Sequence, residues 1–504
     1  MRLRYLAAAV AAGAFLLSPS WAASPNRLVI MHSNDTHSQL DPGNDGLGGV
    51  ARRKTLIDSV RNAEANTMLV DAGDVVQGTL FFTLYGGEAE NKIADLLGYD
   101  LRILGNHEFD NGAEELARKI APTKSVWIAT NYDMRGTELG KKFVPYYIKE
   151  VGGRRIGFIG LNLQPRGMIS EGNYNGVNYL DLYKAANSTA WHLKHNEGVD
   201  MVIALTHIGY EPTGTGTSDL ELARRSEDID VIIGGHSHTV VGPGPGAANP
   251  WRVANAAGDT ILVTQTGKAG RYLGEITIDL DNLGTDYRLI RVDSRLDSVR
   301  QPDVEAVLAP YRPGIDSLMH TPIARSSRAL DAADPALLNY VADYIKLRGK
   351  EISGGNVDFA ITNKGGIRTG LPKGGVSEGN IINMLPFNNR VEVLEISGSD
   401  LARNFDIMAR QGGNGLSKGV EVVFDPETGK CTSVTVNGRP LEADKTYTVA
   451  TIDYLANGGD YMEPLTHGRK TASSPTILSK DLVRYLKDHK GKINPDGSVR
   501  MRAK

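Results

Sequence analysis

The chain has 504 residues and a formal net charge of −3, with 56 Lys and Arg against 59 Asp and Glu. That balance excludes a nucleic-acid-binding protein that relies on a strongly basic surface. Hydrophobic residues make up 41% and charged residues 23%, which is ordinary for a globular protein, and at about 150 residues per domain the length allows two or three domains.

Residues 1–23 are typical of a secretory signal peptide. A basic start (MRLR) precedes an apolar stretch over 5–17, and the small residues Ser20 and Ala22 stand at the −3 and −1 positions of a cleavage site. Cys431 is the only cysteine, so the chain cannot form an internal disulfide. We therefore expect a protein of the periplasm or the extracellular fluid, without a membrane anchor, and leave its oligomeric state open.

Residues 24–300 alternate short apolar runs with amphipathic stretches, which favours a layered α/β domain. The expected strands are 28–31, 68–70, 101–104, 126–129, 156–161, 201–205, 231–233, 261–265 and 274–280. The expected helices between them are 87–97, 113–120, 182–193 and 220–225.

Residues 301–325 carry four prolines, and we expect a linker there with one short helical piece over 304–308. A longer helix is expected over 335–350. The remainder of 326–504 mixes strand patterns with glycine-rich loops, which indicates a second domain of the α+β class.

Clusters of metal-competent side chains follow five of the expected strands. They are NDTH at 34–37, DAGD at 71–74, GNHE at 105–108, TH at 206–207 and GGHSH at 234–238. In open α/β sheets, ligands bind at the carboxyl ends of the strands, so these clusters are expected to converge. Within them, we expect Asp71 only to brace its own turn.

The residue types point to a pair of divalent cations. A bridging carboxylate, neutral imidazoles and oxygen donors suit zinc, manganese or a similar ion better than calcium, which prefers oxygen alone. Two such ions bind a phosphoryl group, generate hydroxide near neutral pH and stabilise the leaving oxygen. The sequence has no phosphate-binding loop of the Gly-x-x-x-x-Gly-Lys-Ser/Thr type and no His-Glu-x-x-His motif, which argues against the corresponding chemistries.

Together these motifs resemble those of the 5′-nucleotidase family. The matching segments are HSNDTH at 32–37, DAGD at 71–74, GNHEFD at 105–110, TH at 206–207, GHSH at 235–238, NKGGIR at 363–368, LPF at 385–387 and LANGGD at 455–460. The resemblance implies an N-terminal αββα metallophosphoesterase sandwich of the calcineurin type, joined by a linker helix to a C-terminal α+β nucleotide-binding domain.

The resemblance also implies the metal ligands. One cation would be held by Asp35, His37, Asp74 and His238, and the other by Asp74, Asn106, His207 and His236, with Asp74 bridging. His107 would stabilise charge on the phosphoryl group or the leaving oxygen, and Asp110 would orient His107.

In the second domain, the resemblance implies that Arg368 and Arg410 contact the phosphate or ribose, that Asp460 binds ribose hydroxyls, and that Tyr454 forms one face of a clamp on the base. Relatives place a second aromatic residue before the expected strand 420–424, but residues 410–419 contain none.

Two explanations of the missing aromatic residue stay open. Either Tyr454 holds the base against an aliphatic residue such as Leu416, or the natural substrate is not a simple nucleoside monophosphate. Lys364, where relatives often carry glycine, would add positive charge near the substrate.

These features predict an exported two-metal phosphoesterase that hydrolyses 5′-nucleotides by attack of metal-bound hydroxide, with a small-molecule nucleotide rather than a nucleic acid as its partner. Alternatives on the same scaffold are pyrophosphate cleavage of UDP-sugars or NAD, cyclic phosphodiester hydrolysis and thiosulfate-ester hydrolysis. A different class, a nucleotide- or metal-binding protein without turnover, would need neither His107 nor Asp110.

Overall fold

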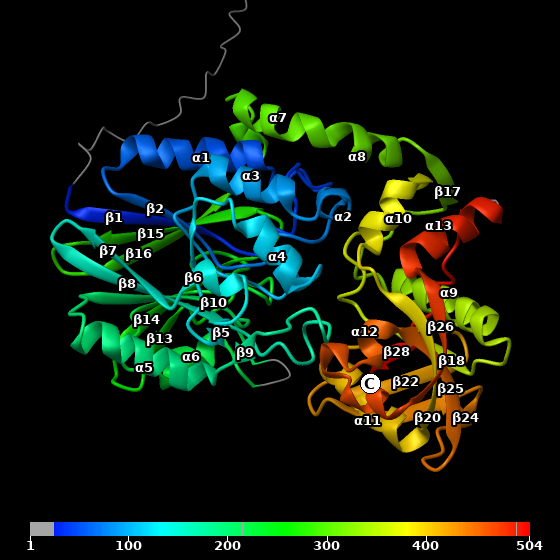
Figure 1. Ribbon diagram of the computed structural model, residues 1–504. Helices are drawn as coiled ribbons and strands as arrows, with labels where there is room; N and C mark the ends of the chain where they lie inside the picture. The colour runs from blue at the N-terminus through cyan, green and yellow to red at the C-terminus, as the bar shows by residue number, and fades with distance from the viewer. Residues whose placement is uncertain (1–24, 213–215, 490) are drawn as a thin grey trace, which may run out of the picture.

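The computed structural model describes residues 25–212, 216–489 and 491–504 (Figure 1). The expected signal peptide, residues 1–23, lies outside the described residues. Within them, the chain forms two domains that lie side by side, with a pair of helices running between them. No helix in the described ranges has the length and apolar character needed to cross a membrane.

In the described part of the N-terminal domain, two seven-stranded sheets pack face to face. The first has the order β16 (Thr285–Arg291), β15 (Tyr272–Asp279), β1 (Arg27–Ser33), β2 (Thr67–Asp71), β3 (Leu101–Arg102), β4 (Val126–Ile128) and β6 (Phe143–Val144). The second has the order β12 (Val240–Val241), β14 (Thr260–Thr266), β11 (Val231–Ile233), β10 (Met201–His207), β8 (Arg154–Asn162) and β7 (Tyr146–Val151), with β13 (Arg252–Ala254) paired to β14. A small separate ribbon joins β5 (Tyr132–Asp133) to β9 (Asn178–Tyr179).

The central strands are buried on both faces, which explains their continuous apolar sequences. In β1, Leu28 and Ile30 face the second sheet, and Val29 and Met31 face helices α1 (Val50–Ala63) and α3 (Glu88–Leu97). Helices α5 (Leu182–His195) and α6 (Asp219–Arg225) cover the outer face of the second sheet. The expected αββα sandwich is therefore confirmed. Two shorter helices, α2 (Leu80–Tyr85) and α4 (Ala113–Ile120), complete the layer beside the first sheet.

The connection between the domains is more helical than the sequence suggested. It contains α7 (Pro302–Leu308), which covers the expected helical piece, and a second helix, α8 (Arg312–Met319). Pro313 and Gly314 led to the prediction of a loop in place of α8. Proline is tolerated in the first turn of a helix, because the N–H groups there have no hydrogen-bond partner within the helix. Arg312 anchors α8 to the N-terminal domain by an ion pair with Asp41.

The C-terminal domain is built from three small sheets and four main helices within the described residues. The sheets are β21 (Gly415–Leu416), β18 (Phe359–Thr362), β25 (Thr446–Ile452), β20 (Arg390–Ser397) and β26 (Arg469–Ile477); β24 (Arg439–Pro440), β23 (Lys430–Val436), β22 (Val420–Asp425) and β28 (Met501–Ala503); and β19 (Gly374–Ser377), β17 (Pro322–Ser326) and β27 (Lys492–Ile493). The helices are α9 (Pro335–Ser353), α10 (Glu378–Met384), α11 (Gly398–Arg410) and α13 (Leu478–Asp488), with a single turn, α12 (Asp453–Ala456), near the other domain.

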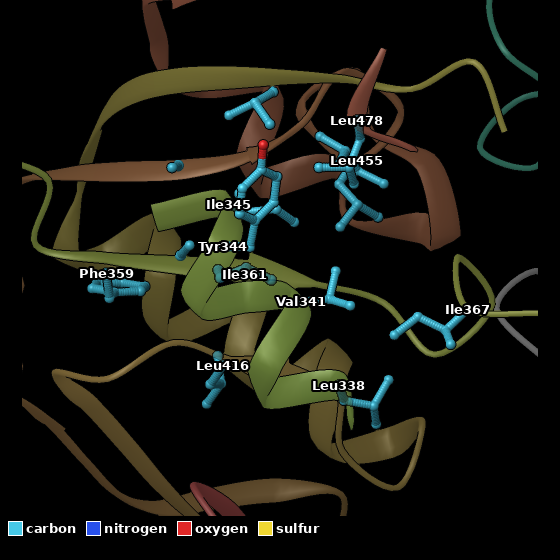
Figure 2. Packing of buried hydrophobic residues seen from close by; sticks show 14 of the residues in the cluster. Leu338, Val341, Tyr344, Ile345, Phe359, Ile361, Ile367, Leu416, Leu455 and Leu478 are labelled. Atoms are coloured by element: carbon cyan, nitrogen blue, oxygen red, sulfur yellow. The ribbon is translucent and has the colours of Figure 1, made fainter. Parts of the chain in front are cut away.

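Figure 2 shows the core of this domain, where α9 crosses the largest sheet. Val341 and Ile345 of α9 pack in one buried cluster with Phe359 and Ile361 of β18. The α+β domain beyond the linker, expected from the sequence, is therefore confirmed.

Replacing Phe359 with alanine should remove one of the largest fully buried side chains of this core. We expect the free energy of unfolding of the C-terminal domain to fall by about 3–5 kcal/mol, because the cavity adds to the lost transfer free energy. Urea unfolding followed by hydrogen exchange of the β18 amides measures the change. Trp191→Ala, at a position 51% exposed, is the control and should change stability by less than about 1 kcal/mol. Equal losses in the two variants would contradict the packing described.

Candidate active site

The polar clusters that follow β1, β2, β3, β10 and β11 meet in one buried pocket. The contacts that connect them are Asp35 Oδ1 to His238 Nε2 (3.5 Å), His37 Nε2 to His238 Nε2 (2.8 Å), Asp35 Oδ1 to His207 Nε2 (3.9 Å), Asp74 Oδ2 to His207 Nε2 (3.1 Å) and His236 Nδ1 to Asn106 Oδ1 (3.1 Å). The structure thus brings together the seven side chains expected to bind metal.

Three sets of acidic and imidazole groups place their ligand atoms within 4.8 Å of one another. They are Asp35, His37 and His238; His37, Asp74 and His107; and Asp74, His207 and His236. Asp74 belongs to two of these sets, so its carboxylate lies between them.

The backbone at this pocket is held in a rarely populated conformation. Five of the expected ligands have left-handed φ angles, namely Asp35 (50°), His37 (47°), Asp74 (55°), His236 (77°) and His238 (57°). For residues other than glycine such a conformation costs on the order of 1–3 kcal/mol each, and it clusters at functional sites. The surrounding hydrogen bonds must therefore impose it.

Two polar atoms that face the pocket make no well-aligned hydrogen bond. Asp35 Oδ1 and His207 Nε2 are buried and have no such bond among the described residues, although His207 Nε2 lies 3.1 Å from Asp74 Oδ2. The other atoms of the same side chains are satisfied: Asp35 Oδ2 accepts from the backbone N–H of His236 (2.9 Å), and His207 Nδ1 lies 2.7 Å from the carbonyl oxygen of Ala72. A donor N–H on Nδ1 leaves a lone pair on Nε2, as a metal ligand requires.

Electrostatics also favour bound cations. Burial lowers the pKa of His236 to about 3 and holds the pKa values of His37 and His238 well below the usual range, so these imidazoles are neutral. Burial also disfavours charge on His207, but Asp74 and Asp35 outweigh it and raise the pKa of that ring to about 10. The two carboxylates thus demand positive charge at this point, and the donor set fits divalent metal ions.

Asp71 lies behind the pocket and accepts hydrogen bonds from the Ser33 hydroxyl (2.6 Å) and the Gly73 N–H (2.9 Å). It braces its turn, as the sequence suggested.

His107 lies at the edge of the pocket in a 3-10 helix, His107–Phe109. Its Nδ1 is 3.0 Å from Asp110 Oδ2, and its Nε2 is 4.0 Å from Asp74 Oδ2. Burial alone would lower the pKa of His107, but Asp110 and Asp74 raise it above the ordinary value. The arrangement orients one ring nitrogen against a carboxylate and leaves the other toward the pocket.

The C-terminal domain closes this pocket. Arg368 Nη2 lies 3.0 Å from both ring nitrogens of His37, and the Phe387 ring lies 5.6 Å from that of His107. A cavity of about 160 Å³ separates the two sides and is lined by Asp74, His107, Arg368, Phe387 and Asp460 among others. The guanidinium of Arg368 therefore faces the same cavity as the side chains expected to bind metal.

Asp460 and Tyr454 form one hydrogen-bonded unit. The Tyr454 hydroxyl donates to Asp460 Oδ1 (2.9 Å) and accepts the Asp460 backbone N–H (3.2 Å), and Asn363 Nδ2 donates to Asp460 Oδ2 (2.6 Å). Gln411 Nε2 donates to the Asp460 carbonyl oxygen (2.8 Å). These bonds hold Asp460 at a φ of 52°.

Three residues discussed from the sequence lie elsewhere. Arg410 is exposed at the end of α11. The aliphatic part of its side chain lies against Gly429 in the β22–β23 hairpin and does not line the cavity. Leu416 is fully buried in the core, so the suggestion that it contacts a base is wrong. Lys364 donates its ammonium to the carbonyl oxygen of Gly412 (2.9 Å).

Sequence reasoning assigned no role to Phe387, Asn363 or Gln411. The first two stand inside motifs that were recognised, LPF at 385–387 and NKGGIR at 363–368, and this was the available signal. Gln411 directly follows Arg410, and no local pattern distinguishes it. A further cavity of about 1140 Å³ adjoins the pocket, shares Asp110, Phe387 and Tyr454 with it, and contains Arg166 as the one basic side chain of its described lining.

Comparison with known proteins agrees with this architecture. Residues 28–240 match the family model described as calcineurin-like phosphoesterase, and residues 316–467 match that described as 5′-nucleotidase, C-terminal domain. The 5′-nucleotidase of Mus musculus is 30% identical over 88% of this chain and 85% of its own length.

Two more relatives extend the comparison. The crystal structure of a 5′-nucleotidase precursor from Thermus thermophilus matches with a TM-score of 0.84 and 30% identity, over 95% of this chain and 99% of that one. A trifunctional nucleotide phosphoesterase of Bacillus subtilis is 27% identical over 93% of this chain, which spans only 34% of that longer protein.

Replacing Tyr454 with phenylalanine should release the turn at Asp460 by removing both bonds of the hydroxyl. We expect the free energy of local opening to fall by about 1–3 kcal/mol and the Asp460 amide to exchange faster with solvent, as measured by hydrogen exchange. The control is Tyr340→Phe, because the Tyr340 hydroxyl bonds to none of the described residues of the same domain. Unchanged exchange at Asp460 would show that the hydroxyl does not hold the turn.

Proposed function

This chain belongs to the 5′-nucleotidase family, and from that membership we propose that it is an exported, dinuclear phosphoesterase that hydrolyses 5′-nucleotides to nucleoside and phosphate. The observation that carries the proposal is the convergence of acidic and imidazole groups in one buried pocket, where Asp35 Oδ1 makes no hydrogen bond and His207 Nε2 lies 3.1 Å from Asp74 Oδ2. A buried carboxylate oxygen without a hydrogen-bond donor favours a bound cation.

The residues fit a pair of divalent ions. One ion would be held by Asp35, His37, Asp74 and His238, and the second by Asp74, Asn106, His207 and His236. Imidazole, carboxylate and amide donors suit zinc or manganese. When bound, the ions would neutralise the phosphoryl oxygens and activate the attacking water.

His107 would act on the leaving oxygen. Asp110 holds its Nδ1, so Nε2 is the nitrogen that faces the cavity and delivers or stabilises a proton there. Phe387 lies against the ring and limits water on that side.

Arg368 would bind the phosphoryl group. Its guanidinium is partly buried at the cavity wall and reaches the pocket from the opposite domain, where a phosphate could accept hydrogen bonds from two of its N–H groups. Asp460 would accept ribose hydroxyls, and Tyr454 would contact the base on one face only.

Export to the periplasm or the medium is part of the same proposal. It is supported by the basic, apolar and small-residue segments within residues 1–23.

The larger cavity favours a second candidate activity, cleavage of the pyrophosphate bond in UDP-sugars or NAD. Its volume of about 1140 Å³ slightly exceeds the usual range of small-molecule sites, which leaves room for a ligand larger than a nucleoside monophosphate, and Arg166 offers a charge for a second phosphate. A binding protein without turnover is disfavoured, because the His107–Asp110 pair serves proton transfer rather than capture.

The proposal is tested by release of inorganic phosphate from AMP, GMP, UMP and CMP, and the second candidate by chromatographic detection of the nucleoside monophosphates that NAD and a UDP-sugar would yield. Protein treated with a chelator should be inactive, and zinc or manganese should restore activity on the nucleoside monophosphates. Because only one aromatic face contacts the base, their kcat/KM values should differ by less than about 10-fold, corresponding to about 1.4 kcal/mol. A preference of 100-fold for one base, or full activity without metal, would contradict it.

His107→Ala should lower kcat by at least about 100-fold, which is the lower range for general acid catalysis. Metal content, measured by elemental analysis, should stay near that of the wild type, because His107 is not among the seven residues proposed as metal ligands. His195→Ala, a surface imidazole, is the matched control and should keep full activity. Near-normal turnover in His107→Ala would remove His107 from the mechanism.

A further inference from the structure

Glu108 is a buried carboxylate beside the metal pocket that does not face it. Its side chain is 6% exposed. Oε1 accepts the backbone N–H of Val75 (2.9 Å), and Oε2 accepts those of Asp74 (3.0 Å) and Gly105 (2.6 Å). One carboxylate therefore connects the loop after β2 with the loop after β3.

The connection is reciprocal. Asp74 Oδ1 accepts the backbone N–H of His107 (2.9 Å), so each loop supplies a carboxylate to the other. The contact leaves no spare room, because a Cβ atom on Gly105 would lie 2.1 Å from Asp74 Oδ1. Asp74 Oδ2 is left to face His207, at 3.1 Å.

Two of these hydrogen bonds stabilise the strained backbone at Asp74. Asp74 has a left-handed φ of 55°, which an ordinary side chain avoids. Hydrogen bonds from backbone N–H groups to an ionised carboxylate are stronger than neutral ones, and two of the three fall on Asp74 and the residue after it. Glu108 thus opposes relaxation of this strained backbone.

We propose that Glu108 is a positioning residue that fixes Asp74 between the two groups of ligands and thereby sets the affinity for the second cation. The inference rests on the proposed function only in requiring that the pocket binds metal. Through the short segment 105–108, the same bonds fix Asn106 and the backbone of His107.

The test uses chelator-treated full-length protein titrated with Mn²⁺ by calorimetry, and electron paramagnetic resonance of the loaded protein. Wild type should bind two ions and give the spectrum of a spin-coupled pair. Glu108→Gln keeps the size of the side chain, but its amide N–H₂ cannot accept a hydrogen bond. We expect at least a 10-fold weaker second site, the usual effect of removing a group that orients metal ligands, and loss of the coupled spectrum.

Glu275→Gln is the matched control. Glu275 is also 6% exposed in the same sandwich, and it pairs with Arg288 rather than with the ligand loops. It should keep both Mn²⁺ affinities whatever its effect on stability. A purely structural role of Glu108 would make the two variants alike.

Glu108→Asp retains the charge but is too short to reach both loops, so we expect intermediate affinity. It carries the test if Glu108→Gln does not fold. Wild-type affinity and a coupled spectrum in Glu108→Gln, or in Glu108→Asp where that variant is needed, would overturn this inference and leave the proposed function intact. Failure of the wild type to bind Mn²⁺ or Zn²⁺ would instead refute the proposed function.

Discussion

The structure of the pocket depends on compensation of the negative charge of two buried carboxylates, Asp35 and Asp74. Each is almost fully shielded from water, and a carboxylate in such a place loses several kcal/mol of solvation. The neutral imidazoles of His37, His236 and His238 supply lone pairs rather than charge, and Arg368 reaches this pocket only from the other domain. The sandwich therefore gathers negative charge at one point, and this is the property that makes the pocket a site for cations.

A second layer of buried acceptors keeps the ligand loops in place. Asp219 accepts from the Thr206 hydroxyl (2.6 Å) and Gln265 Nε2 (2.8 Å), and the same Gln265 amide donates to the carbonyl oxygen of Gly235 (3.0 Å). These bonds connect the ends of β10 and β11, as Glu108 connects those of β2 and β3. The left-handed residues of the pocket persist because this network leaves the loops no relaxed alternative.

The sequence predicted the features that depend on hydrophobic periodicity and on the order of motifs along the chain. It failed where a feature depends on single contacts between segments that are distant in sequence. Buried parallel strands followed by His, Asp and Asn clusters indicated both the sandwich and the convergence of the seven side chains proposed as ligands. Helix α8 escaped because its proline and glycine resemble loop residues out of context. Leu416 was misplaced because an aliphatic residue near an expected site has two possible directions, and burial in the core selected the inward one. Local sequence patterns could not predict that Phe387 lies against His107 or that Arg368 contacts His37. These contacts cross the domain boundary and depend on how the two domains pack.

The walls of the pocket come from two separate hydrophobic cores. One side carries the proposed metal ligands and is supported by the packing between the two sheets of the sandwich. The other side carries Arg368, Tyr454 and Asp460 and is supported by the core around α9. Substitutions that reshape one wall leave the packing beneath the other untouched. Substrate preference can therefore diverge through substitutions in the C-terminal domain while the cluster of acidic and imidazole groups in the sandwich stays unchanged.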